Sequence, residues 1–215
     1  QERVNALKDI KVLIIGETII DQYVFCEALG KSGKEPVLVL RDMETAQYAG
    51  GAVAIARHLA DFCGEISLLS MLGEDGEYED FIKQSLKESV SSKFIYKVGS
   101  PTIVKKRFVE NINKLKVLGV YSVNDELFHG DNEAQFRQLL EELIPQYDLV
   151  IVSDYGHGMI SKDIAKYIAG KATFLTLNAQ INAANIGYHT MDKYKHVDCV
   201  IINETELRHE LREKQ

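Results

Sequence analysis

The chain has 215 residues, 46% of them hydrophobic and 27% charged, a composition typical of a globular protein with room for one large domain. Its formal net charge of −7 disfavours nucleic acid or an anionic membrane as the main partner, because both require a basic surface. No apolar run approaches the roughly 20 residues that a membrane-spanning helix needs.

Short apolar runs alternate with amphipathic patterns along most of the chain. The runs typical of buried parallel strands are 10–15, which ends at Gly16, then 66–71, 149–152, 173–177 and 199–202. Helical patterns are expected from Gly51 to about Phe62, after Gly76 with Val90 on the apolar face, from an N-cap at Asp131, and over 204–214. Strands that alternate with helices predict an α/β fold, with a mainly parallel central sheet flanked by helices on both faces.

Two regions break this alternation, because 22–49 and 93–121 contain strand-like pieces with no helix between them. Consecutive strands without crossover helices predict antiparallel pairing outside the main sheet. We expect these segments to form a small β lid over one end of the sheet. Exposed strand edges in such a lid would favour a homodimer through the lid strands.

The pair Gly50–Gly51 directly precedes an apolar helical pattern. Glycine permits positive φ and lets a ligand approach the main chain, and a helix N-terminus offers unpaired N–H groups. A small polar ligand fits these features. A simple turn into a buried helix fits this stretch equally well.

Polar side chains follow the predicted strands at the edge where ligands bind in parallel sheets. The residues at these positions include Glu17, Asp21, Asp154, Asn178, Asn203 and Glu206. Carboxylates and amides suit a polyol, because sugar hydroxyls need several fixed donors and acceptors. A single residue of this kind could be an ordinary helix cap, but several at one edge favour a binding site.

Other polar stretches leave alternatives open. His157, flanked by glycines, could contact a ligand or lie in a solvent-exposed turn. Lys105, Lys106 and Arg107 alternate along a β-segment, so two of them should share a face, which is either an anion contact or a solvated surface. The stretch 73–77 lacks the ligand spacing of a calcium loop, and we expect a turn capped by Asp75 before the second helix.

The order and spacing of four motifs resemble the ribokinase-like (PfkB-type) carbohydrate kinase family over nearly the whole chain. These motifs are Gly16 with Asp21, Gly50-Gly51-Ala52, Gly73-Glu74-Asp75-Gly76 and Asn203-x-x-Glu206. The stretch 100–107, with Ser153-Asp154-Tyr155, is most similar to the heptose-phosphate kinase domain of bifunctional ADP-heptose synthases. The resemblance implies a ribokinase-like fold that uses ATP and Mg²⁺ to phosphorylate a sugar or sugar-phosphate hydroxyl.

The resemblance also implies roles for particular residues. The substrate would bind at Asp21, Gly50, Gly51, Lys105 and Asp154. The ATP phosphates would lie at Asn178, Asn203 and Glu206, with Glu206 also at Mg²⁺, often through water. The widely spaced Cys26, Cys63 and Cys199 indicate reduced thiols in a cytoplasmic protein.

The family's Gly-Ala-Gly-Asp segment, which supplies the anion hole and the catalytic base, is expected beyond Gln215. We therefore expect 1–215 to be the N-terminal part of one sugar-kinase domain, incomplete at its C-terminus, in a longer parent with further domains. This fragment alone should be inactive, since losing a general base typically costs ~10²–10⁴-fold in rate. Ala54 and Asn178-Ala179-Gln180 depart from the family's pattern, and they favour the alternative of a non-catalytic, kinase-like sugar- or nucleotide-binding module.

Overall fold

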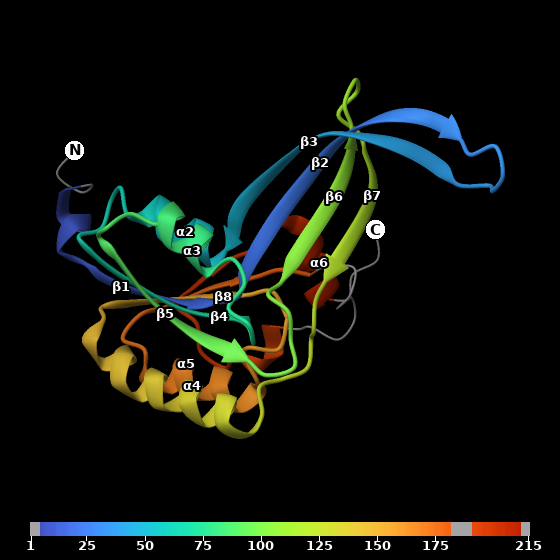
Figure 1. Cartoon of the computed structure of the whole chain (residues 1–215). Coiled ribbons are helices and arrows are strands. Elements are labelled where there is room, and N and C mark those ends of the chain that lie inside the picture. The colour runs from blue at the N-terminus through green and yellow to red at the C-terminus, as the bar shows by residue number, and fades with distance from the viewer. Residues whose placement is uncertain (1–4, 182–190, 212–215) are drawn as a thin grey trace.

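The computed structural model describes residues 5–181 and 191–211, which form a layered body and a second sheet that projects from it (Figure 1). The central sheet of the body has six strands in the order β10-β9-β8-β1-β4-β5, and all its pairings are parallel. Its strands are β1 (Lys11–Gly16), β4 (Glu65–Gly73), β5 (Val90–Lys97), β8 (Leu149–Asp154), β9 (Leu175–Ala179) and β10 (Cys199–Ile201). The predicted α/β fold with a parallel sheet is confirmed.

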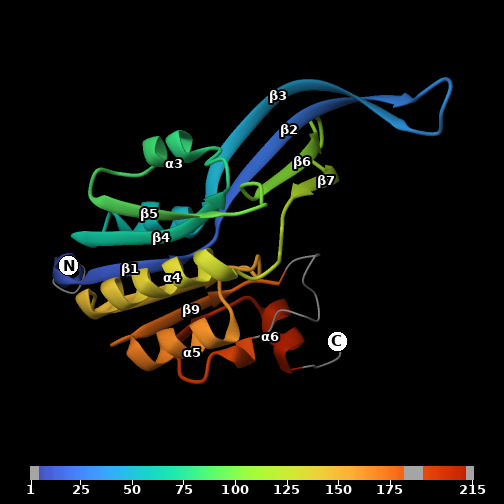
Figure 2. The ribbon, with the colours of Figure 1, turned by 60° about the horizontal axis from the view of Figure 1, so that its bottom comes forward.

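Helices cover both faces of this sheet (Figure 2). One face carries α2 (Ala52–Leu59) and α3 (Glu79–Ser85), and the other carries α4 (Gly130–Leu143) and α5 (Lys162–Lys171), as Figure 1 shows. The remaining helical elements are α6 (Glu204–Leu211) and the 3-10 turns Leu7–Asp9, Ile144–Gln146 and Met191–Lys193. No helix in the described ranges is both long enough and apolar enough to cross a membrane.

The two-residue period of β1 accounts for the two layers of core. Val12 and Ile14 pack with Ala52, Val53 and Ile82 on the α2 and α3 side, while Leu13 and Ile15 pack toward α4 and α5. All four β1 side chains are fully buried. A strand buried on both faces reads as a continuous apolar run, which is why 10–15 could be recognised from the sequence.

The projecting sheet is the lid, with the strand order β3-β2-β6-β7. Its strands are β2 (Thr18–Lys31), β3 (Leu38–Gly51), β6 (Val104–Glu110) and β7 (Lys116–Ser122). The pair β2–β3 extends well beyond the other two strands, and its tip stands clear of the body (Figure 1). The first predicted lid segment, 22–49, lies within this hairpin.

Two expectations about the second lid segment, 93–121, are wrong. Residues Phe94–Tyr96 belong to β5, which pairs with β4 in the central sheet, so this part of the lid begins only at Val104. The lid is also not wholly antiparallel, because β2 and β6 run parallel, with Asp21 opposite Lys105. The chain passes through the body between these two strands, so no tight turn forces them to be antiparallel.

The helix limits also differ from the sequence prediction. Helix α3 ends at Ser85 and Leu86 is extended, so Val90 begins β5 and does not extend the helix's apolar face. Asp75 does not cap α3, since the N-cap is Tyr78, and α4 starts at Gly130 after His129. The predicted C-terminal helix is present as α6, whereas 212–214 lie outside the described residues.

Candidate active site

Asp21 and Gly50 meet where the lid joins the body. Asp21 lies on β2, and its Oδ1 forms an ion pair with Nη1 of Arg107. A methyl group at Gly50 would come within 2.5 Å of Oδ2 of Asp21. The carboxylate therefore occupies the space that only glycine leaves open beside β3.

Gly51 makes the turn from β3 into α2. It is the N-cap of α2 at φ 61° and ψ −139°, a conformation open essentially only to glycine. A Cβ there would lie 2.2 Å from the main-chain oxygen of Glu17. That oxygen instead accepts the N–H of Ala52 at 2.9 Å, which satisfies one of the unpaired donors of α2.

Lys105 and Arg107 lie on β6 and share a face of the lid sheet with Asp21 of the neighbouring strand β2. Lys105 is only 6% exposed, and burial lowers its pKa while Asp21 opposes that shift. The guanidinium of Arg107 lies between the rings of Tyr23 and Tyr121, 5.5 and 5.8 Å from their centroids. This fixes two cations beside the Asp21 carboxylate at the base of the lid.

Asp154 ends β8 and lies in the interior, 1% exposed. Its Oδ2 accepts the hydroxyl of Tyr194 at 2.6 Å and pairs with Nζ of Lys193 at 2.6 Å. Its Oδ1 accepts the N–H of Gly156 at 3.1 Å. The expected direct contact between Asp154 and a substrate stays a prediction, and in this structure the side chain holds the loop that follows β8.

Glu17, directly after β1, is fully buried and binds the same loop. Its Oε2 accepts the N–H of Tyr155 at 2.9 Å, and its Oε1 accepts the N–H of His157 at 3.1 Å. Burial, and then the neighbouring Asp154 carboxylate, raise the pKa of Glu17 to about 7. These effects outweigh the two N–H groups and Lys193, which lower it.

Asn203 and Glu206 form a reciprocal pair at the start of α6. Oδ1 of Asn203 accepts the N–H of Glu206 at 2.9 Å, and Oε2 of Glu206 accepts the N–H of Asn203 at 2.9 Å. Oε1 of Glu206 also accepts the N–H of Ile181 at 3.4 Å. This is the geometry of a capping box, which explains the spacing of the Asn-x-x-Glu motif.

A cavity of about 250 Å³ brings the predicted nucleotide residues together. It is lined by Tyr155, Asn178, Gln180, Ile201, Ile202, Asn203 and Glu206. Nδ2 of Asn178 donates to the oxygen of Ile201 at 2.8 Å, which orients this amide at the wall. Glu206 is 7% exposed, and within the described ranges no cluster of three or more His, Cys, Asp or Glu is placed to hold a metal ion.

Comparison with known proteins identifies the family to which this chain belongs. Residues 9–215 match the family model of the pfkB family carbohydrate kinases. The chain belongs to this family. The family prediction made from Asp21, the paired glycines and the Asn-x-x-Glu motif is thus confirmed.

Curated relatives of this family member include bifunctional proteins HldE. That of Histophilus somni (strain 129Pt) is 30% identical over 158 residues, which make up 74% of this chain and 32% of the relative. That of Campylobacter jejuni subsp. jejuni serotype O:2 is 26% identical over 167 residues, or 78% of this chain and 34% of the relative. The chain therefore spans about a third of the length of these relatives.

Solved structures of other carbohydrate kinases share the fold. A carbohydrate kinase from Agrobacterium tumefaciens superposes with a TM-score of 0.64 at 19% identity, over 94% of this chain and 63% of that one. Arabidopsis thaliana ribokinase, solved with ribose and ATP, gives 0.62 at 16% identity, over 94% of this chain and 62% of that one. The ribokinase-like fold is confirmed.

Two contacts in this pfkB family chain could not be found from the sequence. Glu17 follows Gly16 at a strand end, but nothing in the sequence indicated that it reaches the loop after β8. Two of the basic residues at 105–107 were expected to share a face, and Lys105 and Arg107 do so, but the pairing of Arg107 with Asp21 depends on the parallel register of β2 and β6. His157 is 1% exposed and pairs through Nδ1 with Asp125 at 2.7 Å, so the solvent-exposed turn is excluded.

Proposed function

We propose that the protein containing this chain transfers the γ-phosphoryl group of ATP to a hydroxyl of a sugar or sugar phosphate. Family membership supports carbohydrate kinase activity in general. The observation that carries the proposal is the presence of two groups of polar residues in one structure. One group surrounds Asp21 at the base of the lid, and the other lines the cavity at Glu206 beyond the carboxyl ends of β9 and β10.

On the substrate side, the carboxylate of Asp21 would accept hydrogen bonds from sugar hydroxyls next to Gly50 and Gly51. Lys105 and Arg107 add positive charge at the same place, on a chain whose net charge is −7. Cations fixed in a partly buried site suit an anionic substituent, which favours a sugar phosphate over a neutral sugar. The heptose phosphate suggested by the sequence resemblance is one such substrate.

On the nucleotide side, the cavity of about 250 Å³ is large enough for phosphate groups but smaller than most sites that enclose a whole nucleotide. Its amide and carboxylate lining fits Mg²⁺, which keeps several waters and uses one or two protein carboxylates together with the phosphates. Asn178 and Asn203 would orient the phosphates, and Glu206 would hold the metal through water. When bound, Mg²⁺ neutralises charge on the transferred group.

Further parts of the proposal concern the parent protein. The catalytic base would lie outside this chain, so the chain alone would not phosphorylate a sugar. The parent would carry further domains and act in the cytoplasm.

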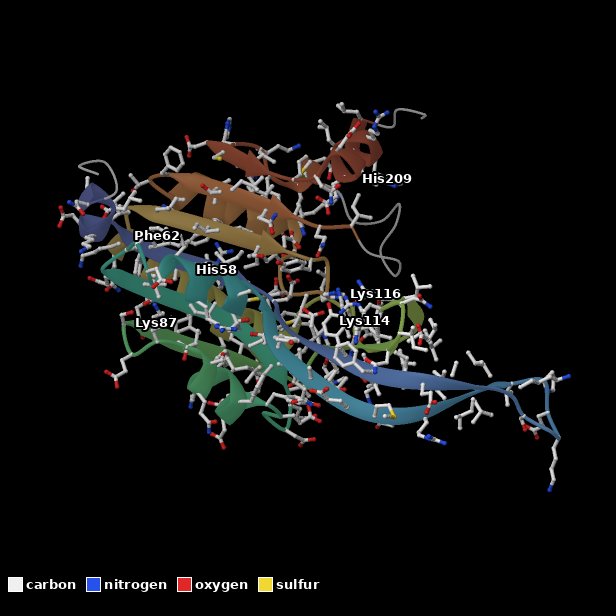
Figure 3. The ribbon with its side chains drawn as sticks, turned by 90° about the horizontal axis from the view of Figure 1, so that it is seen from above. His58, Phe62, Lys87, Lys114, Lys116 and His209 are labelled. Carbon is white, nitrogen blue, oxygen red and sulfur yellow. The ribbon has the colours of Figure 1, made fainter. Side chains whose placement is uncertain are left out.

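The lid would form a homodimer, because β7 exposes Leu118 and Val120, each more than half exposed. Lys114 and Lys116, labelled in Figure 3, border a hollow of about 390 Å³ on the lid, whose aromatic walls are Tyr23, Phe25 and Tyr48.

The test is ATP consumption by the purified parent protein with a panel of sugars and sugar phosphates. Turnover should depend on one sugar class and on Mg²⁺, and Asp21→Asn should raise the sugar KM with little change in the KM for ATP. Asp42→Asn is the matched control, since Asp42 is an exposed carboxylate elsewhere on the same lid hairpin. Sugar binding without any ATP turnover would instead support the non-catalytic binding module.

A further inference from the structure

Glu17 is the point at which the two halves of the site meet. Through its main chain it contacts the first turn of α2, since its oxygen accepts the N–H of Ala52 at 2.9 Å beside Gly51. Through its side chain it contacts the loop after β8, accepting the N–H groups of Tyr155 and His157. One residue is thus bonded to the sugar-side turn and to a loop on the nucleotide side.

That loop reaches the nucleotide cavity directly. Tyr155 lines the cavity together with Asn178, Asn203 and Glu206. On the other side, a Cβ on Gly51 would lie 2.2 Å from the oxygen of Glu17, so the glycine turn and Glu17 are in contact without a gap. A shift of Glu17 would therefore displace both walls, because packed interiors transmit small movements.

The side chain of Glu17 is held in a dense polar environment. The titratable groups that act on it or pack beside it come from five places: Asp154 on β8, Tyr155 and His157 in the loop after it, Lys193 and Tyr194 at the 3-10 turn, Lys97 on β5 and Lys105 on β6. A fully buried carboxyl costs folding free energy when it is ionised, and burial together with the Asp154 carboxylate raises the pKa of Glu17. The hydrogen bonds that this carboxyl accepts from the N–H groups of Tyr155 and His157 are a structural reason for a glutamate at this buried position.

We infer that Glu17 is a positioning residue that joins the glycine turn before α2 to the loop Tyr155–Gly158. The sugar side and the nucleotide side of the site are thereby held in a fixed position relative to each other. This inference deepens the proposed function, because it assigns the coupling of the two substrate sites to one residue. Glu17 itself does not need to touch either substrate.

Amide hydrogen exchange on this chain tests the structural part without any ligand. Glu17→Ala removes both side-chain acceptors, so the amides of Tyr155 and His157 should exchange roughly tenfold faster, the size expected for a lost buried hydrogen bond. The amide of Ala52 should also exchange faster, although its own acceptor is a main-chain oxygen that the substitution leaves in place. Faster exchange at Ala52 is the signature of coupling, and a purely local clamp would not produce it.

Two further variants make the result decisive. Glu17→Gln keeps the shape and one acceptor, so it should restore protection at one of the two loop amides even if Glu17→Ala folds poorly. Glu74→Gln is the control, because Oε2 of Glu74 likewise accepts a main-chain N–H, that of Gly99 at 2.8 Å, at a distant turn. Unchanged exchange at Ala52 in both Glu17 variants would overturn the inference.

The kinetic part uses the parent protein. Glu17→Gln should raise the KM for sugar and the KM for ATP together, whereas Asp21→Asn should raise only the KM for sugar. An increase confined to one substrate would contradict the coupling. Absence of any kinase activity in the unmodified parent would refute the proposed function, and the exchange experiment would still decide whether Glu17 couples the two segments.

Discussion

Gly51→Ala should destabilise the chain far more than a glycine-to-alanine change normally does. Gly51 has φ 61° and ψ −139°, a region that costs other residues of order 1–3 kcal/mol. The new Cβ would also lie 2.2 Å from the oxygen of Glu17 and 3.1 Å from the nitrogen of Ile19. Both atoms belong to the backbone, so neither can move aside by changing a side-chain rotamer.

Relief of this overlap would break the Ala52 to Glu17 hydrogen bond, which is worth about 1 kcal/mol. Strain and the lost bond together predict a cost of about 3 kcal/mol or more, a large share of the ~5–15 kcal/mol that stabilises a typical domain. Urea unfolding followed by circular dichroism measures it. If the free energy of unfolding falls by about 2 kcal/mol per molar urea, the urea concentration at the unfolding midpoint should fall by roughly 1.5 M.

Gly170→Ala is the matched control, because Gly170 lies in α5, and no described atom beyond its chain neighbours and its own helix backbone is within 4 Å of where a Cβ would be. Alanine is the better helix former there, so this change should leave stability unchanged or increase it by up to about 1 kcal/mol. A free energy of unfolding for Gly51→Ala within about 0.5 kcal/mol of that of the unmodified chain would contradict this expectation, provided that Gly170→Ala behaves as described.

Gly50→Ala places its Cβ 2.5 Å from a side-chain oxygen of Asp21 and 3.2 Å from the main-chain oxygen of Ile19, so stability should fall, but less than for Gly51→Ala, while the parent's sugar KM rises roughly tenfold; an unchanged KM would argue against Asp21 as a sugar contact. The pKa of Glu17 is raised from 4.5 to about 7, so the free energy of unfolding should fall by roughly 3 kcal/mol from this group as pH rises through that window; Glu17→Gln should remove this slope in urea titrations at several pH values, and an identical slope in both proteins would refute it. Asn203→Ala should lower the free energy of unfolding by about 1 kcal/mol through loss of the cap on Glu206 N–H, while Asn203→Asp should retain it; equal stability of the two variants would contradict the capping role.

The central sheet could be predicted because its strands are buried on both faces. Leu13 and Ile15 face one helix layer while Val12 and Ile14 face the other, so the whole run must be apolar. The same rule failed for β5, since Val90 fits the apolar face of a short helix as well as a strand. Pairing with β4, with Val90 opposite Ile66, decides between these alternatives, and that contact is not local in sequence.

The candidate site shows the same difference between features that are local in sequence and contacts that are not. Glycines and strand-end polar residues could be found because their positions follow from local geometry, such as the positive φ of Gly51. Arg107 and Glu17 could not be assigned, because each acts on a partner from a distant segment: Arg107 on Asp21 and Glu17 on Tyr155 and His157. The parallel register of β2 and β6, which the sequence led us to expect as antiparallel, creates the first of these contacts.

The Asn-x-x-Glu motif poses a final problem, because a helix cap and a ligand site were alternatives from the sequence. The reciprocal bonds of Asn203 and Glu206 account for the spacing without any ligand. Each carboxylate oxygen has two lone pairs, however, and the N–H groups of Asn203 and Ile181 engage one on each oxygen. The remaining lone pairs suit water molecules around Mg²⁺, and the cap fixes the carboxylate at the cavity wall where the proposed role needs it. The helix cap and the ligand site are therefore compatible. Nucleotide binding by Asn203→Asp tests the ligand site alone, because this variant keeps the cap while changing the charge.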